Sequence, residues 1–154
     1  MDLSSLKAEL DDDPLGLGYA EMTEAQRIAS LNARTRSVNR VLPSSELLAW
    51  SGINGRISKL RKAAEGEAPY TLLSDDVRAV AIAAYKLVSR PDTSFDKTAE
   101  GRAAMLDALV AAGVFTADDR ADLLARTVTL VSRAQELGLP EIGIGYIRTC
   151  GSTI

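Results

Sequence analysis

Residues 13–23 read Asp-Pro-Leu-Gly-Leu-Gly-Tyr-Ala-Glu-Met-Thr, a short apolar segment that contains one proline and two glycines. Before it, residues 3–10 place leucines at i, i+3 and i+7, which is the spacing of one helix face. Pro14 ends this helix, because the residue before a proline avoids the α-helical region. After it, residues 23–26 have the pattern T-x-x-Q, a capping box that starts a second helix. The segment is therefore a rigid turn between two helices.

The composition favours an all-α fold. The chain has 154 residues, which is enough for one domain with a core of moderate size. Hydrophobic residues make up 46% and charged residues 25%, the balance of an ordinary globular protein. Aromatic residues are only 5%, so alanine, leucine and valine must fill the core. These side chains suit closely packed helices better than a β-sandwich.

Helical patterns recur along most of the chain. Apolar periodicity, N-caps such as Ser74 and Thr116, and glycine stop signals mark the expected helices. They lie at about 24–33, 44–51, 53–64, 75–89, 97–112 and 117–137. The predicted architecture is an all-α single domain over residues 1–140, a compact bundle of six or seven helices.

The C-terminal end has a different pattern. Residues 141–148 alternate apolar side chains with glycine, and a period of two is typical of a strand. We therefore expect residues 141–154 to form an extended C-terminal arm. Such an arm could lie along its own domain or add to a sheet edge on a neighbouring molecule.

The residue types present remove most of the usual catalytic and metal-binding groups. The chain has no histidine, which excludes a Ser-His-Asp triad and histidine-based zinc sites. Residues 16–18 (G-L-G) are no phosphate loop, since no strand precedes them and no lysine follows at the required spacing. The three consecutive aspartates at 11–13 lack the alternate spacing of an EF-hand, and the lone Cys150 is expected to be unreactive. We expect a protein that is not an enzyme and has no cofactor, no metal and no small-molecule substrate.

Membrane and export segments are not recognised in the sequence. The longest apolar runs, such as 79–85 and 108–112, are too short to span a bilayer. The first residues have neither a basic region nor an apolar run of the kind found in signal peptides. We expect a protein that is made and assembled inside a cell.

Positive charge is concentrated in one region, although the net charge is -3. Between Glu24 and Lys62 the chain has eight basic residues and two acidic ones. One predicted helix in this region has four cations, which are Arg56, Lys59, Arg61 and Lys62. Such a stripe can neutralise phosphates, so nonspecific DNA contact is one interpretation. The alternative is a solvated helix face.

Two segments of the sequence resemble one known family. Residues 6–10 (L-K-A-E-L), the turn at 13–23 and the L-N pair at 31–32 resemble the N-terminal part of a family of small tailed-bacteriophage proteins. Those proteins open with a helix, followed by a D-P-L-G-x-G-Y-x-x-M turn and a helix ending in L-N. Residues 131–139 resemble the S-R-A-x-E-L-G-L segment near the family's C-terminal end, which an extended tail follows. The family often has arginine where this chain has Leu17.

The resemblance implies a phage protein without catalytic residues. The expected function is a structural component of a tailed-phage virion, in the neck, head–tail connection or tail, made in the cytoplasm of the bacterial host. We expect a homo-oligomeric ring that also contacts other virion proteins, in which each copy lays its extended ends on a neighbour. The expected interface residues are apolar and lie in the two ends: Leu15, Tyr19, Met22, Ile142, Ile144 and Tyr146. The alternatives are a small DNA-associated phage protein, and a host-interaction or assembly factor absent from the particle.

Overall fold

The computed structural model describes residues 3–151, and these are mostly helical, as predicted. Eight α-helices of eight or more residues, a ninth of four residues and two short 3-10 turns occur in this part of the chain. Two short strands, β1 (Arg36–Asn39) and β2 (Val128–Val131), pair in a two-stranded sheet. The helix count exceeds the predicted six or seven, because the helix expected at 117–137 is divided in two and residues 144–151 form a helix where an extended arm was expected.

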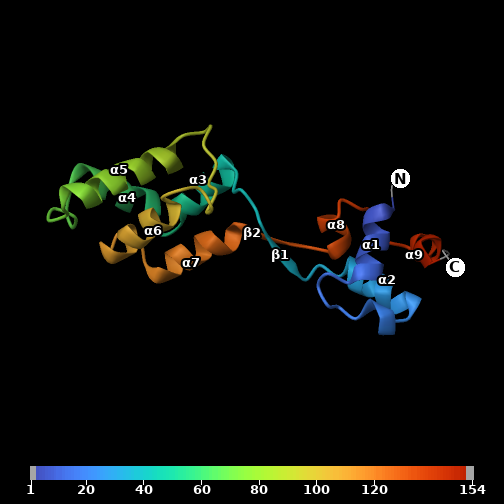
Figure 1. Ribbon diagram of the computed structural model, residues 1–154. Coiled ribbons are helices and arrows are strands. Elements are labelled where there is room, and N and C mark those ends of the chain that lie inside the picture. The colour runs from blue at the N-terminus through green and yellow to red at the C-terminus, as the bar shows by residue number, and fades with distance from the viewer. Residues whose placement is uncertain (1–2, 152–154) are drawn as a thin grey trace. The chain divides into compact units, whose positions relative to one another are not determined.

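The chain divides into two compact units (Figure 1). Unit 1 is formed by both ends of the chain, up to Val38 and from Leu130 onward. Unit 2 is the continuous segment Asn39–Thr129. The chain crosses from one unit to the other twice, once within β1 and once within β2. These two strands pair with each other. The prediction of one domain over 1–140 with a boundary at residue 140 is therefore wrong.

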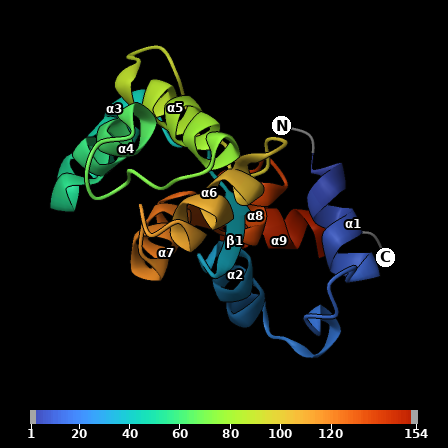
Figure 2. The same cartoon turned by 90° about the vertical axis from the view of Figure 1, so that its left-hand side faces the viewer.

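Unit 2 is a helical bundle. Its helices are α3 (Ser44–Gly52), α4 (Arg56–Glu65), α5 (Asp75–Ser89), α6 (Arg102–Ala111) and α7 (Ala117–Arg126), with a 3-10 turn over Ile53–Gly55. Figures 1 and 2 both show α4 and α5 side by side. The helix expected at 75–89 from apolar periodicity is confirmed as α5, which buries Ala81, Ala84 and Val88. The Trp50 and Phe115 rings pack edge to face at 5.4 Å, so the one tryptophan of the chain lies in this core.

Unit 1 has a separate core. Its helices are α1 (Ser4–Asp12), α2 (Glu24–Asn32), α8 (Arg133–Glu136) and α9 (Ile144–Gly151), with a 3-10 turn over Tyr19–Glu21. Side chains from both ends of the chain are buried together: Leu6, Tyr19, Leu31, Ala134, Leu139, Ile142, Ile147 and Cys150. The predicted capping box is present at the start of α2, where the Thr23 side chain accepts from the Gln26 amide and Gln26 bonds back to Thr23. Local capping and apolar spacing thus define the helices, and burial of both chain ends defines the unit.

The extended C-terminal arm is not confirmed. Residues 144–151 form helix α9, which buries Ile147 and Cys150 at the i, i+3 spacing of a helix face. Residues 142–145 alternate isoleucine with glycine, so their apolar side chains repeat every two residues, as in a strand. Glycine has no side chain to show a helical period, and the helix therefore could not be recognised from this pattern. Residues 152–154 of the expected arm lie outside the described residues.

The long helix expected at 117–137 is interrupted. Helix α7 ends at Arg126, β2 follows, and Ser132 starts α8 with a new capping box. Thr127, Val128, Thr129 and Val131 are β-branched, and such a run favours a strand over a helix. Similarly, α6 begins at Arg102 instead of residue 97, because the Asp96 carboxylate binds the Thr98 amide and hydroxyl in a turn.

The unit 2 core gives a direct stability prediction. Leu109 is fully buried there, so Leu109→Ala should lower the free energy of unfolding by about 2–5 kcal/mol. Leu72→Ala is the matched control, because Leu72 is 96% exposed and its truncation should change stability by less than about 0.5 kcal/mol. Urea unfolding followed by Trp50 fluorescence measures both variants. Similar midpoints for the two would contradict the core assignment.

Candidate functional site

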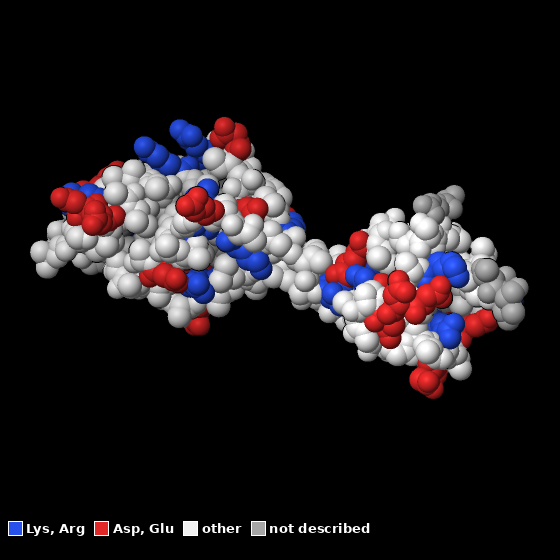
Figure 3. Space-filling model, viewed as in Figure 1, with Lys and Arg blue, Asp and Glu red and all other residues white. Residues whose placement is uncertain are grey.

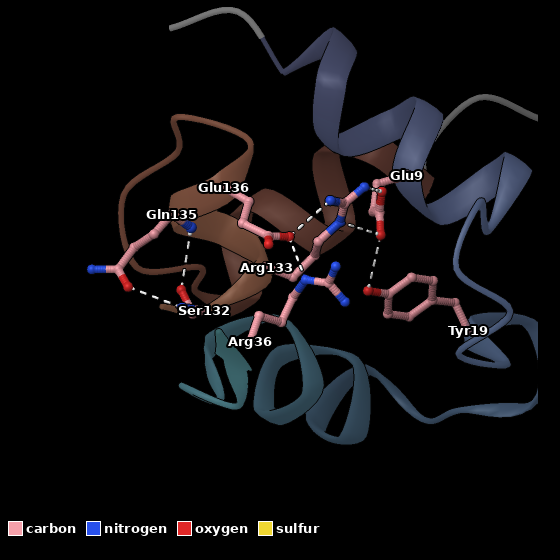
Figure 4. A network of polar contacts seen from close by, with 7 residues as sticks. All are labelled: Glu9, Tyr19, Arg36, Ser132, Arg133, Gln135 and Glu136. Carbon is pink, nitrogen blue, oxygen red and sulfur yellow. Dashed lines mark hydrogen bonds and ion pairs between the residues drawn. The ribbon is translucent and has the colours of Figure 1, made fainter. Parts of the chain in front are cut away.

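The segments 6–23 and 131–139 meet in unit 1 around a buried carboxylate (Figure 4). Glu9 of α1 has a side chain that is only 1% exposed. Arg133 of α8 binds it with two parallel hydrogen bonds, Nε to Oε1 at 2.8 Å and Nη2 to Oε2 at 2.6 Å. The Tyr19 hydroxyl donates to the same carboxylate at 3.3 Å. A bidentate pair of this kind fixes the relative position of its two elements, here α1 and α8.

A second carboxylate extends this network. Glu136 accepts from Arg133 Nη1 at 2.9 Å and from Arg36 Nε at 2.5 Å. Its pKa is lowered, first by the hydrogen bond from Arg133 and further by Arg36. The hydrogen bond to Glu9 raises the pKa of Arg133 above its usual range. Figure 3 shows basic and acidic side chains close together on the visible face of unit 1, in agreement with these pairs.

The turn at residues 13–18 is held by its own aspartate. The Asp13 carboxylate accepts from the Leu17 amide at 2.8 Å and the Gly18 amide at 2.6 Å. Gly16 and Gly18 have φ of +64° and +81°, values that favour glycine. The turn leaves two leucines at the surface, Leu15 at 38% and Leu17 at 37% exposure. A constrained backbone therefore presents a pair of apolar side chains to solvent.

The C-terminal segment is tied to its own unit by a side-chain amide. Asn32 Nδ2 donates to the Ile142 carbonyl and the Ile142 amide donates to Asn32 Oδ1, both at 2.8 Å. This pairing satisfies both backbone groups of a buried residue that lies outside any helix or strand. Asn32, the last residue of α2, therefore holds the C-terminal segment in place.

The structure corrects the predicted assembly interface. Tyr19 and Ile142 are buried inside their own chain, and Met22 and Tyr146 are half-buried against the same core. Four of the six residues therefore stabilise unit 1 itself, and the prediction that Tyr19 and Ile142 bind a neighbouring copy is wrong. The remaining two, Leu15 and Ile144, are exposed.

The predicted basic stripe on α4 is corrected as well. Arg56 is 4% exposed, and its guanidinium lies 4.6 Å from the centre of the Trp50 ring. Its Nε donates to Asp119 at 2.7 Å and its Nη1 donates to the Trp50 carbonyl at 3.0 Å. Arg61 pairs with Glu65 and Glu67. Arg56 cannot reach DNA from this position, and the two half-buried lysines of the set, Lys59 and Lys62, do not make a stripe alone.

Asp119 is the carboxylate that neutralises Arg56. Burial raises its pKa, but hydrogen bonds from Thr116 and from Arg56 outweigh burial, so the pKa lies below its usual value. Thr116 and Asp119 also form the predicted cap of α7, with bonds of 2.9 and 3.0 Å. The same aspartate therefore starts a helix and compensates a buried cation.

The remaining candidate groups carry no arrangement typical of catalysis. Cys150 is buried, and burial raises the pKa of its thiol, which lowers the thiolate fraction. Over residues 3–151, no group of three or more cysteine, aspartate or glutamate side chains is placed to hold a metal ion. Within the same range, no helix is long and apolar enough to cross a bilayer.

Comparisons with known proteins do not assign this chain to a family. Searches against family models, curated proteins and solved structures each found no match to this chain. Function must therefore be argued from the residues and their geometry.

Sequence reasoning did not identify the charged network that organises unit 1. Glu9 and Arg133 are separated by 124 positions, and their pairing has no local signal. A partial signal was present, since Glu9 lies between Leu6 and Leu10, the buried and half-buried leucines of α1.

The network predicts an unusual tyrosine titration. Burial and the nearby Glu9 carboxylate raise the pKa of Tyr19 to about 12. A titration followed by tyrosinate absorbance should therefore show one phenol ionising well above the ordinary value of about 10. Tyr19→Phe should remove this late step and leave the earlier ones. A late step that persists in Tyr19→Phe would contradict the assignment.

Acid should weaken unit 1 through Glu136. Its folded pKa is lowered, so its stabilising contribution is complete above the unfolded pKa and is lost as the pH falls through the folded pKa. Between about pH 5 and pH 3, the wild-type chain should lose more stability than Glu136→Gln. Urea unfolding followed by far-UV circular dichroism measures this difference. Equal losses in the two proteins would show that the Arg133 and Arg36 contacts do not stabilise the charged form.

Proposed function

We propose that this protein is a non-enzymatic structural component of a tailed-phage particle, in the neck, the head–tail connection or the tail. The observation that supports the proposal most is the placement of the two resembling segments, 13–23 and 131–139, in one unit. They are joined there through Tyr19, Glu9 and Arg133. The two segments are far apart in the sequence but belong to the same structural unit. The resemblance therefore applies to unit 1 and not to two unrelated turns.

The surface that would contact a neighbour differs from the one expected from sequence. Since Tyr19 and Ile142 are buried, the contact falls on the exposed apolar residues of unit 1, which are Leu15, Leu17, Leu130 and Ile144. Leu15 and Leu17 are the best placed, because the Asp13 hydrogen bonds hold their turn in one conformation. Little conformational entropy is then lost on association, and a rigid contact loop binds more tightly than a flexible one.

A ring is the assembly that we propose for this surface. A turn that contacts a different surface on the next copy makes a head-to-tail interface, and such interfaces close into rings when the rotation allows it. Each interface can be modest, because a closed ring repeats it in every copy. The proposed partners are further copies of this chain and other virion proteins, and the proposed location is the virion.

The turn provides the test of this mechanism. Leu15→Ser/Leu17→Ser should weaken self-association by about tenfold, because association would bury only the exposed 38% and 37% of the two leucines, which contributes about 1–2 kcal/mol in total. Sedimentation across a concentration series measures the association constant, and circular dichroism checks that the variant folds. Leu72→Ser is the control, since Leu72 is exposed in unit 2.

Two outcomes would count against the proposal. A wild-type protein that stays monomeric at all concentrations, alone and with particle extracts, would contradict the ring. Mass spectrometry of purified particles tests location, and absence of the chain from particles that infect normally would favour a host-interaction or assembly factor instead.

A further inference from the structure

A hollow in unit 2 is lined by cations from two helices and the loop between them. It has a volume of about 210 Å³ and lies beside the C-terminal end of α5. Its lining residues are Ala83, Lys86, Leu87, Arg90, Thr93 and Arg102. Lys86 belongs to the last turn of α5, Arg90 follows that helix, and Arg102 is the first residue of α6. The three positive charges therefore converge from separate parts of the chain.

These cations are not neutralised within the described part of the protein. No ion pair is formed there by Lys86, Arg90 or Arg102, and no carboxylate lines the hollow. Five other arginines of unit 2 are paired, namely Arg40, Arg56, Arg61, Arg120 and Arg126, whereas Arg78 forms no ion pair among the described residues. Figure 3 shows basic side chains standing out from the surface over the end of α5. What distinguishes Lys86, Arg90 and Arg102 is that three unpaired cations line the same hollow.

Arg102 adds a second observation. Its Nε is buried and has no hydrogen-bond acceptor among the described residues. A buried donor that stays unpaired costs free energy, so an acceptor from outside the chain would be stabilising at this position. Guanidinium groups also match the geometry of oxyanions, because their donors lie in one plane.

Free carbonyl groups at the C-terminal end of α5 would repel an anion. The Thr93 hydroxyl lies against two of these carbonyl groups. The Thr93 hydroxyl lies 2.5 Å from the Leu87 carbonyl oxygen and 3.1 Å from that of Arg90. The nearest carboxylates in the sequence, Asp92 and Glu100, do not line the hollow. Glu100 lies instead at the neighbouring apolar hollow, which it shares with Arg102.

We propose that Lys86, Arg90 and Arg102 form a site for a phosphate group, presented either by a DNA backbone or by a free phosphate compound. The two arginines supply planar donors and Lys86 supplies a point charge, the combination used for phosphate recognition in proteins. This site is distinct from the sequence-predicted stripe on α4, where Arg56 and Arg61 are already paired. It is also independent of the virion proposal, because it concerns unit 2 alone.

Two double variants test the site with the whole chain. Lys86→Gln/Arg90→Gln removes two charges from the hollow, and Lys59→Gln/Lys62→Gln removes two charges from α4 as a matched control. One titration adds inorganic phosphate and follows backbone amide shifts. Another adds a labelled DNA duplex and follows fluorescence anisotropy over a series of salt concentrations.

We expect saturable binding in at least one of the two titrations, and we expect this binding to require the cations of the hollow. Lys86→Gln/Arg90→Gln should weaken it by about tenfold or more, while Lys59→Gln/Lys62→Gln should retain it. With DNA, the hollow variant should also reduce the slope of log affinity against log salt by about one for each cation removed.

The two titrations distinguish the sources of the phosphate. Saturable shifts at residues 86–102 with inorganic phosphate identify a small-anion site, and binding of DNA alone identifies the backbone of the duplex. Equal weakening by the two double variants would mean that only net charge matters and would overturn the site. Failure to bind either probe would overturn it too. Neither result would bear on whether the chain belongs to a particle.

Discussion

The buried ion pair between Glu9 and Arg133 is the contact on which unit 1 depends. It joins α1 to α8 across a separation of 124 residues, and Tyr19 and Glu136 attach to its two partners. A carboxylate that is only 1% exposed would be strongly destabilising without its cation. The pair therefore specifies which segments meet, because Arg133 is the cation that compensates the buried Glu9 carboxylate and it comes from the other end of the chain.

This arrangement changes how the chain ends can act. Both ends carry apolar residues, and apolar ends without a core of their own would be expected to bind neighbours. Here Tyr19, Ile142, Ile147 and Cys150 fill a core that the ends make together. The exposed apolar residues of unit 1 are Leu15, Leu17, Leu130 and Ile144, and the first two lie on the constrained Asp13 turn. The proposed assembly uses the surface of a folded unit and does not require an exchange of arms.

Sequence reasoning succeeded where the determining forces are local. The capping boxes at Thr23 and Thr116, the cap at Ser74 and the buried stripe of α5 follow from contacts within four residues, and the structure confirms them. The strand β2 had a local signal in its β-branched residues, but helical periodicity on both sides concealed it. The burial of Arg56 had no local signal at all, because its partner Asp119 lies 63 residues away. The same limit applies to Glu9 with Arg133, and therefore to the division into two units and to the candidate site.

A double-mutant cycle on Glu9 and Arg133 tests the central claim most directly. The variants are Glu9→Leu, Arg133→Met and the pair together, and amide hydrogen exchange at Leu31, in the core of unit 1, reports the free energy of opening. Arg133→Met should lower this free energy by about 3–5 kcal/mol, because it leaves the Glu9 carboxylate buried without its cation. Glu9→Leu should cost less, because Arg133 keeps Glu136 as a partner. The double variant should recover a large part of the loss, as expected for residues in contact. Single losses that are small, or that simply add in the double variant, would contradict the account of how the chain ends are held.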